Sequence, residues 1–225
     1  MNQITKNTER FSNRVENYVK YRPHYPLEII DFLKSECNLN ENTIITDIGS
    51  GTGTSTKLFL DNGNKVFGVE PNPEMRKAAE NYLKNYTEFE SINGTAEKTT
   101  LENDSIDMII SGQAFHWFDK EKCKTEFNRI LKKDCYLILF WNEKTESNEF
   151  MKAYYDLLKI YGTDYEKVNH SLSTDDVAIG NFYSPGNFKK KVFEYQQMLD
   201  YKGLEGRLLS SSYIPLDGEN YDKMI

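Results

Sequence analysis

Short apolar runs alternate with amphipathic segments between residues 27 and 141. The apolar runs have the length of buried strands, whereas the segments between them carry apolar residues at helical spacing. This alternation predicts βαβ units, and hence an α/β fold in which helices cover both faces of a mostly parallel sheet. The expected strands are residues 43–48, 65–69, 89–92, 105–111 and 136–141, and the expected helices are 27–33, 54–61, 73–85 and 120–131.

Three details support individual elements of this pattern. The run at 136–141 is continuously apolar, as expected of a strand covered on both faces. Asn72 and Asp119 stand where helix N-caps are expected, and Pro73 occupies a first helical position. Gly63 is suited to end the helix before it.

The two ends of the chain follow other patterns. Residues 15–22 have helical spacing, and Pro23 and Pro26 end any helix there. After Asn142 we expect a helix with an aromatic face at 150–161, a polar loop-rich stretch at 164–186, a sixth strand at 192–199, a short helix at 204–211 and a polar tail.

Composition narrows the possible partners. The 225 residues carry a net charge of −7, which makes nucleic acid an unexpected partner because phosphate binding needs clustered Lys and Arg. Residues 1–10 lack the apolar region of a signal peptide, and no apolar run reaches membrane-spanning length. Cys37, Cys123 and Cys135 are too widely spaced for a metal site. We therefore expect reduced thiols, a cytoplasmic protein and no metal.

Residues 46–53, with the sequence TDIGSGTG, carry the candidate chemistry. A strand, a glycine-rich turn and a helix form the place where an α/β sheet receives a nucleotide-like ligand. The spacing is G-x-G-x-G rather than the dinucleotide pattern G-x-G-x-x-G. Glu70 ends the next strand, where a carboxylate can accept both hydroxyls of a ribose. A plain tight turn and a solvated strand end are the alternatives for these two features.

Six ordered motifs within residues 10–215 resemble the class I S-adenosylmethionine-dependent methyltransferases. More narrowly, they are similar to the small-molecule group called methyltransferase type 11, related to trans-aconitate methyltransferases. The matching stretches are YVKYRP at 18–23, DIGSGTG at 47–53, GVEPNPEM at 68–75, GTAE at 94–97, QAFHWF at 113–118 and RILK at 129–132.

The resemblance implies a Rossmann-like three-layer sandwich with a helical lid and cap. It divides the chain into an N-terminal lid and first helix (1–36), a cofactor-binding core (37–142), a cap or substrate region (143–188) and a return to the core (189–225). It also implies an S-adenosyl-L-methionine site formed by Tyr18, Arg22, Asp47, Gly49, Ser50, Gly51, Gly53, Glu70, Pro71, Asn72, Met75, Ala96, Glu97 and Gln113. In this site Glu70 would hold the ribose, and Arg22 would pair with the cofactor carboxylate.

The implied reaction is an in-line transfer of a methyl group to a small-molecule acceptor. His116 is the candidate general base, with a packed position in the wall formed by residues 115–117 as its alternative. The acceptor is not readable from the sequence. Aromatic residues of the cap suit either an acceptor chamber or a plain core: Tyr154, Tyr155, Tyr161, Tyr165 and Phe182. A monomer and a homodimer are equally open.

Two departures from the family pattern leave alternatives. Residues 133–135 read Lys-Asp-Cys where relatives have Pro-Gly-Gly, and nothing after Asp217 reads as the final antiparallel strand, so we expect that strand to be missing or the chain to be truncated. A non-catalytic cofactor-binding or interaction protein is therefore the first alternative. An NAD(P)-dependent oxidoreductase, disfavoured by the glycine spacing, is the second, and an RNA methyltransferase is weaker still.

Overall fold

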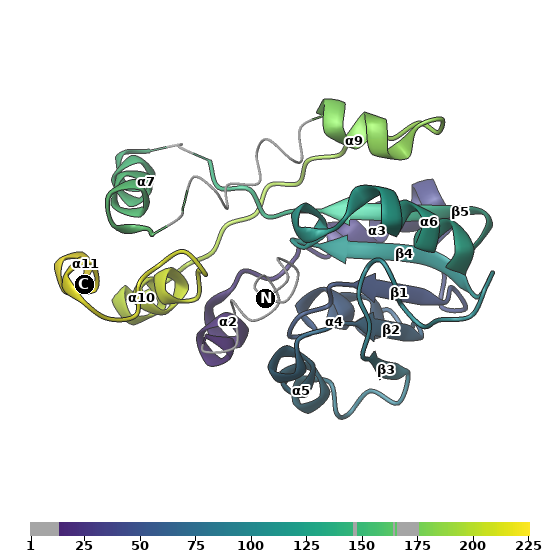
Figure 1. The fold of residues 1–225 in the computed structure, drawn as a ribbon, viewed down its shortest axis with the longest axis horizontal. Helices are drawn as coiled ribbons and strands as arrows, with labels where there is room; N and C mark the ends of the chain where they lie inside the picture. The colour runs from purple at the N-terminus through teal and green to yellow at the C-terminus, as the bar shows by residue number, and fades with distance from the viewer. Residues whose placement is uncertain (1–13, 146–147, 164, 166–175) are drawn as a thin grey trace.

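Five parallel strands form the centre of the molecule, in the order β3-β2-β1-β4-β5. The computed structural model describes residues 14–145, 148–163, 165 and 176–225. The strands are β1 (Ile45–Ile48), β2 (Val66–Val69), β3 (Phe89–Ile92), β4 (Ile106–Gly112) and β5 (Leu131–Phe140). Figure 1 shows them as one twisted sheet. The predicted α/β class and the five core strands are confirmed, and all five carboxyl ends lie at one edge.

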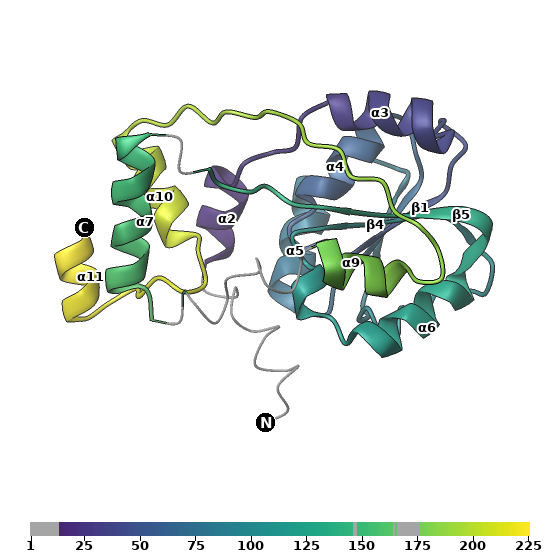
Figure 2. The same ribbon diagram turned by 90° about the horizontal axis from the view of Figure 1, so that it is seen from above.

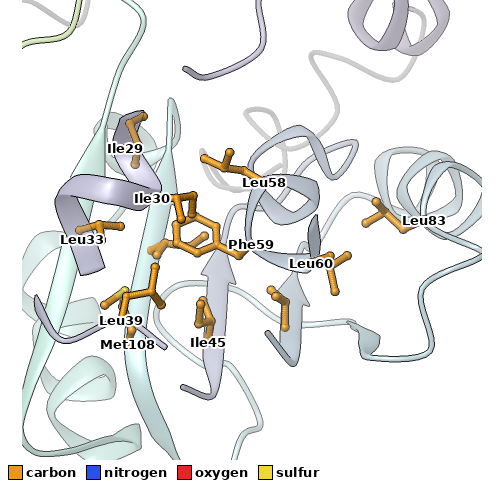
Figure 3. Close-up of a cluster of buried hydrophobic side chains, with 12 residues drawn as sticks. Ile29, Ile30, Leu33, Leu39, Ile45, Leu58, Phe59, Leu60, Leu83 and Met108 are labelled. Carbon is orange, nitrogen blue, oxygen red and sulfur yellow. The ribbon is translucent and has the colours of Figure 1, made fainter. Parts of the chain in front are cut away.

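Helices cover both faces of this sheet. One face packs against α3 (Glu28–Cys37) and α4 (Thr54–Asp61), with α5 (Pro73–Tyr82) beside them. The other face packs against α6 (Lys120–Ile130) and α9 (Asp176–Tyr183). Figure 3 shows the first cluster, in which Phe59 of α4 lies between Ile30 of α3 and Ile45 of β1. This arrangement explains why the strands read as apolar runs rather than as alternating ones.

A second group of helices lies apart from the sheet. We call it the helical group: α2 (Val15–Tyr21), α7 (Glu149–Tyr161), α10 (Tyr201–Leu209) and α11 (Glu219–Met224). Leu158, Leu208, Ile214 and Met224 form its buried centre. Figures 1 and 2 both show this group beyond the carboxyl ends of the strands. Helices from the two ends of the chain thus fold together.

The structure corrects four predictions for the second half of the chain. Residues 192–199 do not form a strand; they run without regular structure from α9 to α10, with Met198 91% exposed. The predicted return to the core at 189–225 is also wrong for its helices, because α10 packs against α2 and α11 against α7. The loop-rich stretch at 164–186 contains helix α9, although residues 164 and 166–175 of it lie outside the described residues.

The prediction of a strand at 192–199 was wrong for a physical reason. A strand must pair with a neighbour and bury one face, and here Phe193 packs against the core while Tyr195 and Leu199, which would share its face, are exposed. The polar tail was also misread, because it contains α11, whose Met224 is buried in the helical group.

Strand β5 forms one edge of the sheet. Ile138 and Phe140 face one apolar cluster and Leu137 and Leu139 face the other, as predicted for a strand covered on both faces. These side chains are nevertheless only half-buried, because no strand among the described residues pairs with the outer edge of β5. The final antiparallel strand expected of relatives is therefore missing from the described part of the fold.

Candidate active site

The glycine loop connects the end of β1 to the start of α4. Gly49, Gly51 and Gly53 all have positive φ, a conformation that side chains disfavour. A Cβ on Gly49 would lie 2.5 Å from that of Ala114, and one on Gly53 would lie 2.7 Å from Leu83. A Cβ on Gly51 would meet only Met75, at 3.9 Å. Two of the glycines therefore serve close packing, and Gly51 is the one with open space beside its Cα.

Asp47 lies completely buried beneath this loop. Its Oδ2 atom accepts hydrogen bonds from Ser55 at 2.6 Å and Thr56 at 2.8 Å, both on the first turn of α4. Its Oδ1 atom is buried without a hydrogen-bond partner. Burial raises the pKa of Asp47 to about 6, against the lowering effect of those hydroxyl donors. Asp47 Oδ1 is therefore an acceptor position that no donor among the described residues fills.

Glu70 joins the glycine loop to the end of β2. Its Oε2 atom accepts from the backbone N–H of Gly51 at 3.0 Å, and its Oε1 atom accepts from that of Asn72 at 2.9 Å. Burial raises its pKa, while these two backbone donors oppose the shift. A carboxylate offers about four acceptor positions, so Glu70 retains capacity for ligand hydroxyls.

The start of α5 borders the same site. Asn72 caps this helix by accepting from the backbone N–H groups of Glu74 and Met75, as predicted. Arg76 donates to the carbonyls of Glu70 and Pro71 and so fixes the turn that presents them. Met75 is thereby held, buried, within van der Waals reach of a Cβ on Gly51.

Two further predicted positions follow strand β3. Ala96 is buried in the core cluster under α6. Glu97 accepts from the backbone N–H of Asp119 at 2.9 Å, so its carboxylate already helps to fix the start of α6. This bond gives Glu97 a structural role besides the predicted one.

Gln113 and His116 follow strand β4. Gln113 has a φ of 60° and donates from its backbone to Phe140 and from its side chain to Asn142, so it ties the ends of β4 and β5 together. His116 lies in a short 3₁₀ turn with its ring 4.6 Å from that of Trp117. This packed contact fits the alternative interpretation of His116, while its role as a base stays a prediction.

Tyr18 and Arg22 lie in the helical group, not on the glycine loop. The Arg22 guanidinium stacks on the Tyr18 ring at 4.8 Å and donates to the Ser210 carbonyl at 3.0 Å. These two residues therefore meet each other, while their role in a lid over the cofactor stays a prediction. Helix α2 contacts α5, the helix whose first turn borders the glycine loop.

Sequence reasoning missed Tyr25, which connects these regions. Its hydroxyl would lie 2.7 Å from a Cβ on Gly112 at the end of β4, and its ring packs edge-on against Phe140 at 4.7 Å. Burial raises the pKa of Tyr25 well above its usual value; Tyr18 and Asp47 add to this increase, and the positive charge of Arg22 opposes it. In the sequence, Tyr25 lies between Pro23 and Pro26, and this position indicated only a lid segment and no role in the site.

A pocket of about 240 Å³ lies beside the glycine loop. Its lining is His24, Tyr25, Thr54, Lys57, Leu58, Asp61 and Tyr82. It reaches the start of α4 but takes in none of the residues predicted to bind a cofactor. Among the residues that the structure describes, no cluster suits a metal ion and no helix is long and apolar enough to cross a membrane.

The predicted residues thus divide mainly between the surroundings of the glycine loop and the helical group, where Tyr18 and Arg22 lie. Asp47, Gly51, Glu70, Asn72 and Met75 surround the open side of the glycine loop at the carboxyl ends of β1 and β2, where open α/β sheets bind their ligands. A carboxylate after the second strand and a glycine loop after the first are typical of a Rossmann-like nucleotide-binding domain.

Comparison with known proteins identifies similar methyltransferases. Residues 46–139 match the family model described as methyltransferase domain, type 11. An uncharacterized methyltransferase-like protein of Schizosaccharomyces pombe is 30% identical over 68% of this chain and 59% of its own. An uncharacterized methyltransferase of Mycobacterium tuberculosis is 32% identical over 70% of this chain and 61% of its own. Residues 46–139 are therefore similar to the methyltransferase domains of the type 11 group.

A solved structure supports the fold. A protein of Methanococcus maripaludis, assigned as an S-adenosyl-L-methionine-dependent methyltransferase, aligns with a TM-score of 0.58 at 15% identity, covering 81% of this chain and 84% of its own. At that identity the likeness concerns the fold alone. The chain spans about three-fifths of the length of the curated relatives named above.

Proposed function

We propose that this protein uses S-adenosyl-L-methionine to methylate a small-molecule acceptor. One observation carries the proposal: the Glu70 carboxylate is hydrogen-bonded to Gly51, the loop glycine with open space beside its Cα. The similarity to methyltransferase domains favours this cofactor over a nicotinamide dinucleotide. The residues present fit it, because the site combines an unpartnered buried acceptor, an acidic strand end and an adaptable apolar contact.

Each residue would hold a different part of the cofactor. Asp47 Oδ1 would accept from the ammonium group of the methionine portion. Glu70 would accept from the ribose hydroxyls with its remaining acceptor positions. Met75 would pack against the adenine, and the N–H groups at the start of α4 would favour negative charge nearby.

The chain's own contribution to the reaction is alignment and exclusion of water. The bound cofactor would supply an activated methyl group on a sulfonium, which is ready for in-line displacement. The protein must then orient the acceptor and keep water from it. His116 follows β4 and is the candidate base for an acceptor that has to lose a proton.

Calorimetry with S-adenosylhomocysteine, the demethylated product, tests the cofactor assignment. We expect one site per chain with micromolar affinity and no change in NADH fluorescence when NADH is mixed with the protein. The exposed variant Glu80→Gln serves as a control that changes charge on α5 without touching the loop. Absence of binding at millimolar product, by protein whose circular dichroism is native, would contradict the proposal.

A further inference from the structure

Three cationic side chains converge in the helical group without an acidic partner among the described residues. Arg22 ends α2, Lys144 follows β5 and Arg207 lies in the last turn of α10. Among the described residues, none of the three forms an ion pair, although ion pairs occur elsewhere in the fold. Uncompensated cations removed from water are costly, so their placement together calls for an explanation.

Direct contacts bring the three residues together. Arg22 donates to the Ser210 carbonyl at 3.0 Å, and Arg207 lies 3.5 Å from the Ser210 hydroxyl. Lys144 lies 3.4 Å from the Tyr213 hydroxyl and 5.3 Å from the centre of the Tyr154 ring. Ser210 and Tyr213 are close in sequence, so one short segment after α10 links all three cations.

Polar atoms in this cluster lack partners. The Nε atom of Arg22 and the hydroxyl of Tyr154 are buried, and neither has a hydrogen bond within the part of the chain that the structure describes. Burial and repulsion by Arg22 lower the pKa of Arg207 to about 10, and burial and its cationic neighbours also lower that of Lys144. A bound anion would satisfy these donors and offset the repulsion.

The cluster adjoins the candidate active site. Asn142, two residues before Lys144, accepts a hydrogen bond from Gln113 at the end of β4. It also donates to the carbonyl of His24, two residues after Arg22, at 3.4 Å. In Figure 2 the chain after β5 runs from the strand ends toward α7, with α2 lying between the two parts of the molecule. The cations thus lie beyond the carboxyl ends of the strands, on the same side of the sheet as the glycine loop.

We propose that Arg22, Lys144 and Arg207 bind an anionic group of the methyl acceptor, a carboxylate or a phosphate, as an anchor that positions the molecule. This inference rests on the proposed methyltransferase function. The anchored group is not the atom that is methylated, because three cations would withdraw charge from it and weaken it as a nucleophile. The neighbouring rings of Tyr18, Tyr154 and Tyr155 suit an acceptor with a flat or apolar body.

The test separates the acceptor's anion from the cofactor's own carboxylate. Calorimetry on the whole cofactor-free chain would use 3-phenylpropionate and phenyl phosphate as anionic probes, and 3-phenylpropanamide as the neutral match. The variants are Lys144→Gln and Arg207→Gln, with Lys202→Gln as an exposed control on the same helix as Arg207. S-adenosylhomocysteine is titrated into every variant, and circular dichroism checks folding.

We expect both anionic probes to bind the wild-type protein and the Lys202→Gln control, and the amide to bind neither. Lys144→Gln and Arg207→Gln should each weaken anion binding by about tenfold or more, with product affinity unchanged within about twofold. Unchanged anion binding in folded variants would overturn the proposal, as would a loss confined to the product. Anion binding without any product binding by the wild type would overturn the acceptor role together with the proposed function.

Discussion

The Glu70 carboxylate accepts a hydrogen bond from the backbone N–H of Gly51 at 3.0 Å. This bond joins the ends of two adjacent parallel strands, β1 and β2, through the two features that the sequence marks most strongly. The other oxygen of Glu70 holds the N–H of Asn72, which in turn caps α5. One buried side chain therefore fixes both loops that would surround a cofactor.

Replacing Glu70 with Gln should affect binding more than folding. The amide can still accept one backbone N–H, but its NH₂ group faces the other donor, and the negative charge is lost. Hydrogen bonds to charged groups contribute roughly 1.5–3 kcal/mol, so product affinity should fall by about 10- to 100-fold. Calorimetry with S-adenosylhomocysteine measures this, with exposed Glu80→Gln as the matched control. Equal affinity in Glu70→Gln and wild type would remove Glu70 from the site.

Two alanine substitutions separate ligand space from packing in the glycine loop. Both Gly51 and Gly53 have positive φ, so alanine costs roughly 1–2 kcal/mol at either position. At Gly53 the new Cβ would also lie 2.7 Å from Leu83, which adds an overpacking cost of roughly 1–3 kcal/mol. Gly53→Ala should therefore lower the unfolding temperature more than Gly51→Ala.

Product binding should show the opposite order. The Cβ of Gly51→Ala projects into the space on the open side of the loop and should weaken binding strongly in a protein that still folds. Thermal unfolding and calorimetry on the same two preparations provide the comparison. If Gly51→Ala binds the product as well as wild type does, the ligand lies elsewhere.

The sheet and its caps could be predicted because their signals are local. Asn72 and Asp119 both cap the helices that the sequence predicted, and the strands carry apolar runs bounded by turn residues. The helical group could not be assembled from the sequence, since its helices come from both ends of the chain. Its packing depends on side chains about 190 residues apart, such as Arg14, which donates to the carbonyls of Leu209 and Ser211.

The candidate site also has one part that the sequence predicted and one part that it did not. The positions around Gly51 and Glu70 follow from a known spacing between consecutive strands. Of the cation cluster, the sequence marked only Arg22, as a partner for the cofactor carboxylate. Lys144 and Arg207 gave no signal, because they stand far from Arg22 in ordinary charged surroundings. Only the fold shows that they share Ser210 and Tyr213 as neighbours and lack an acidic partner among the described residues.

Asp47 should make stability and binding depend on pH. Its pKa is about 6 in the folded state and near 3.8 when unfolded, so between these values the native state holds a proton that the unfolded chain has lost. Stability therefore falls as the pH rises from about 4 to 6, by about 3 kcal/mol in total. Asp47→Asn keeps an acceptor for Ser55 and Thr56 and should raise the unfolding temperature at pH 7.5 but not at pH 4.

The same substitution should have the opposite effect on the cofactor. An ammonium group beside Asp47 is stabilised by the ionised carboxylate, so product affinity in the wild type should increase as the pH rises through about 6. Asp47→Asn should bind more weakly at pH 7.5 and lose this pH dependence. Titrations at pH 5.5 and 7.5 decide the matter, and an unchanged pH profile in the variant would place the titrating group elsewhere.

Gly206 sets the approach of α10 to α2. A Cβ at this position would lie 2.2 Å from the ring of Tyr21, so Gly206→Ala must push the two helices apart despite its better helix propensity. We expect a loss of roughly 1–3 kcal/mol in unfolding free energy. In Gly180→Ala on α9 the new Cβ meets only Phe188 at 3.6 Å, so this control should instead gain up to roughly 1 kcal/mol.

The double variant Gly206→Ala with Tyr21→Ala tests whether that contact is the cause. Removing the ring relieves the clash, so the two substitutions together should cost less than the sum of their separate effects. Because α2 and α10 carry Arg22 and Arg207, Gly206→Ala should also weaken the binding of phenyl phosphate while leaving S-adenosylhomocysteine binding intact. Equal losses for both ligands would mean that the helical group and the glycine loop unfold together, and the separation of the two sites would then be wrong.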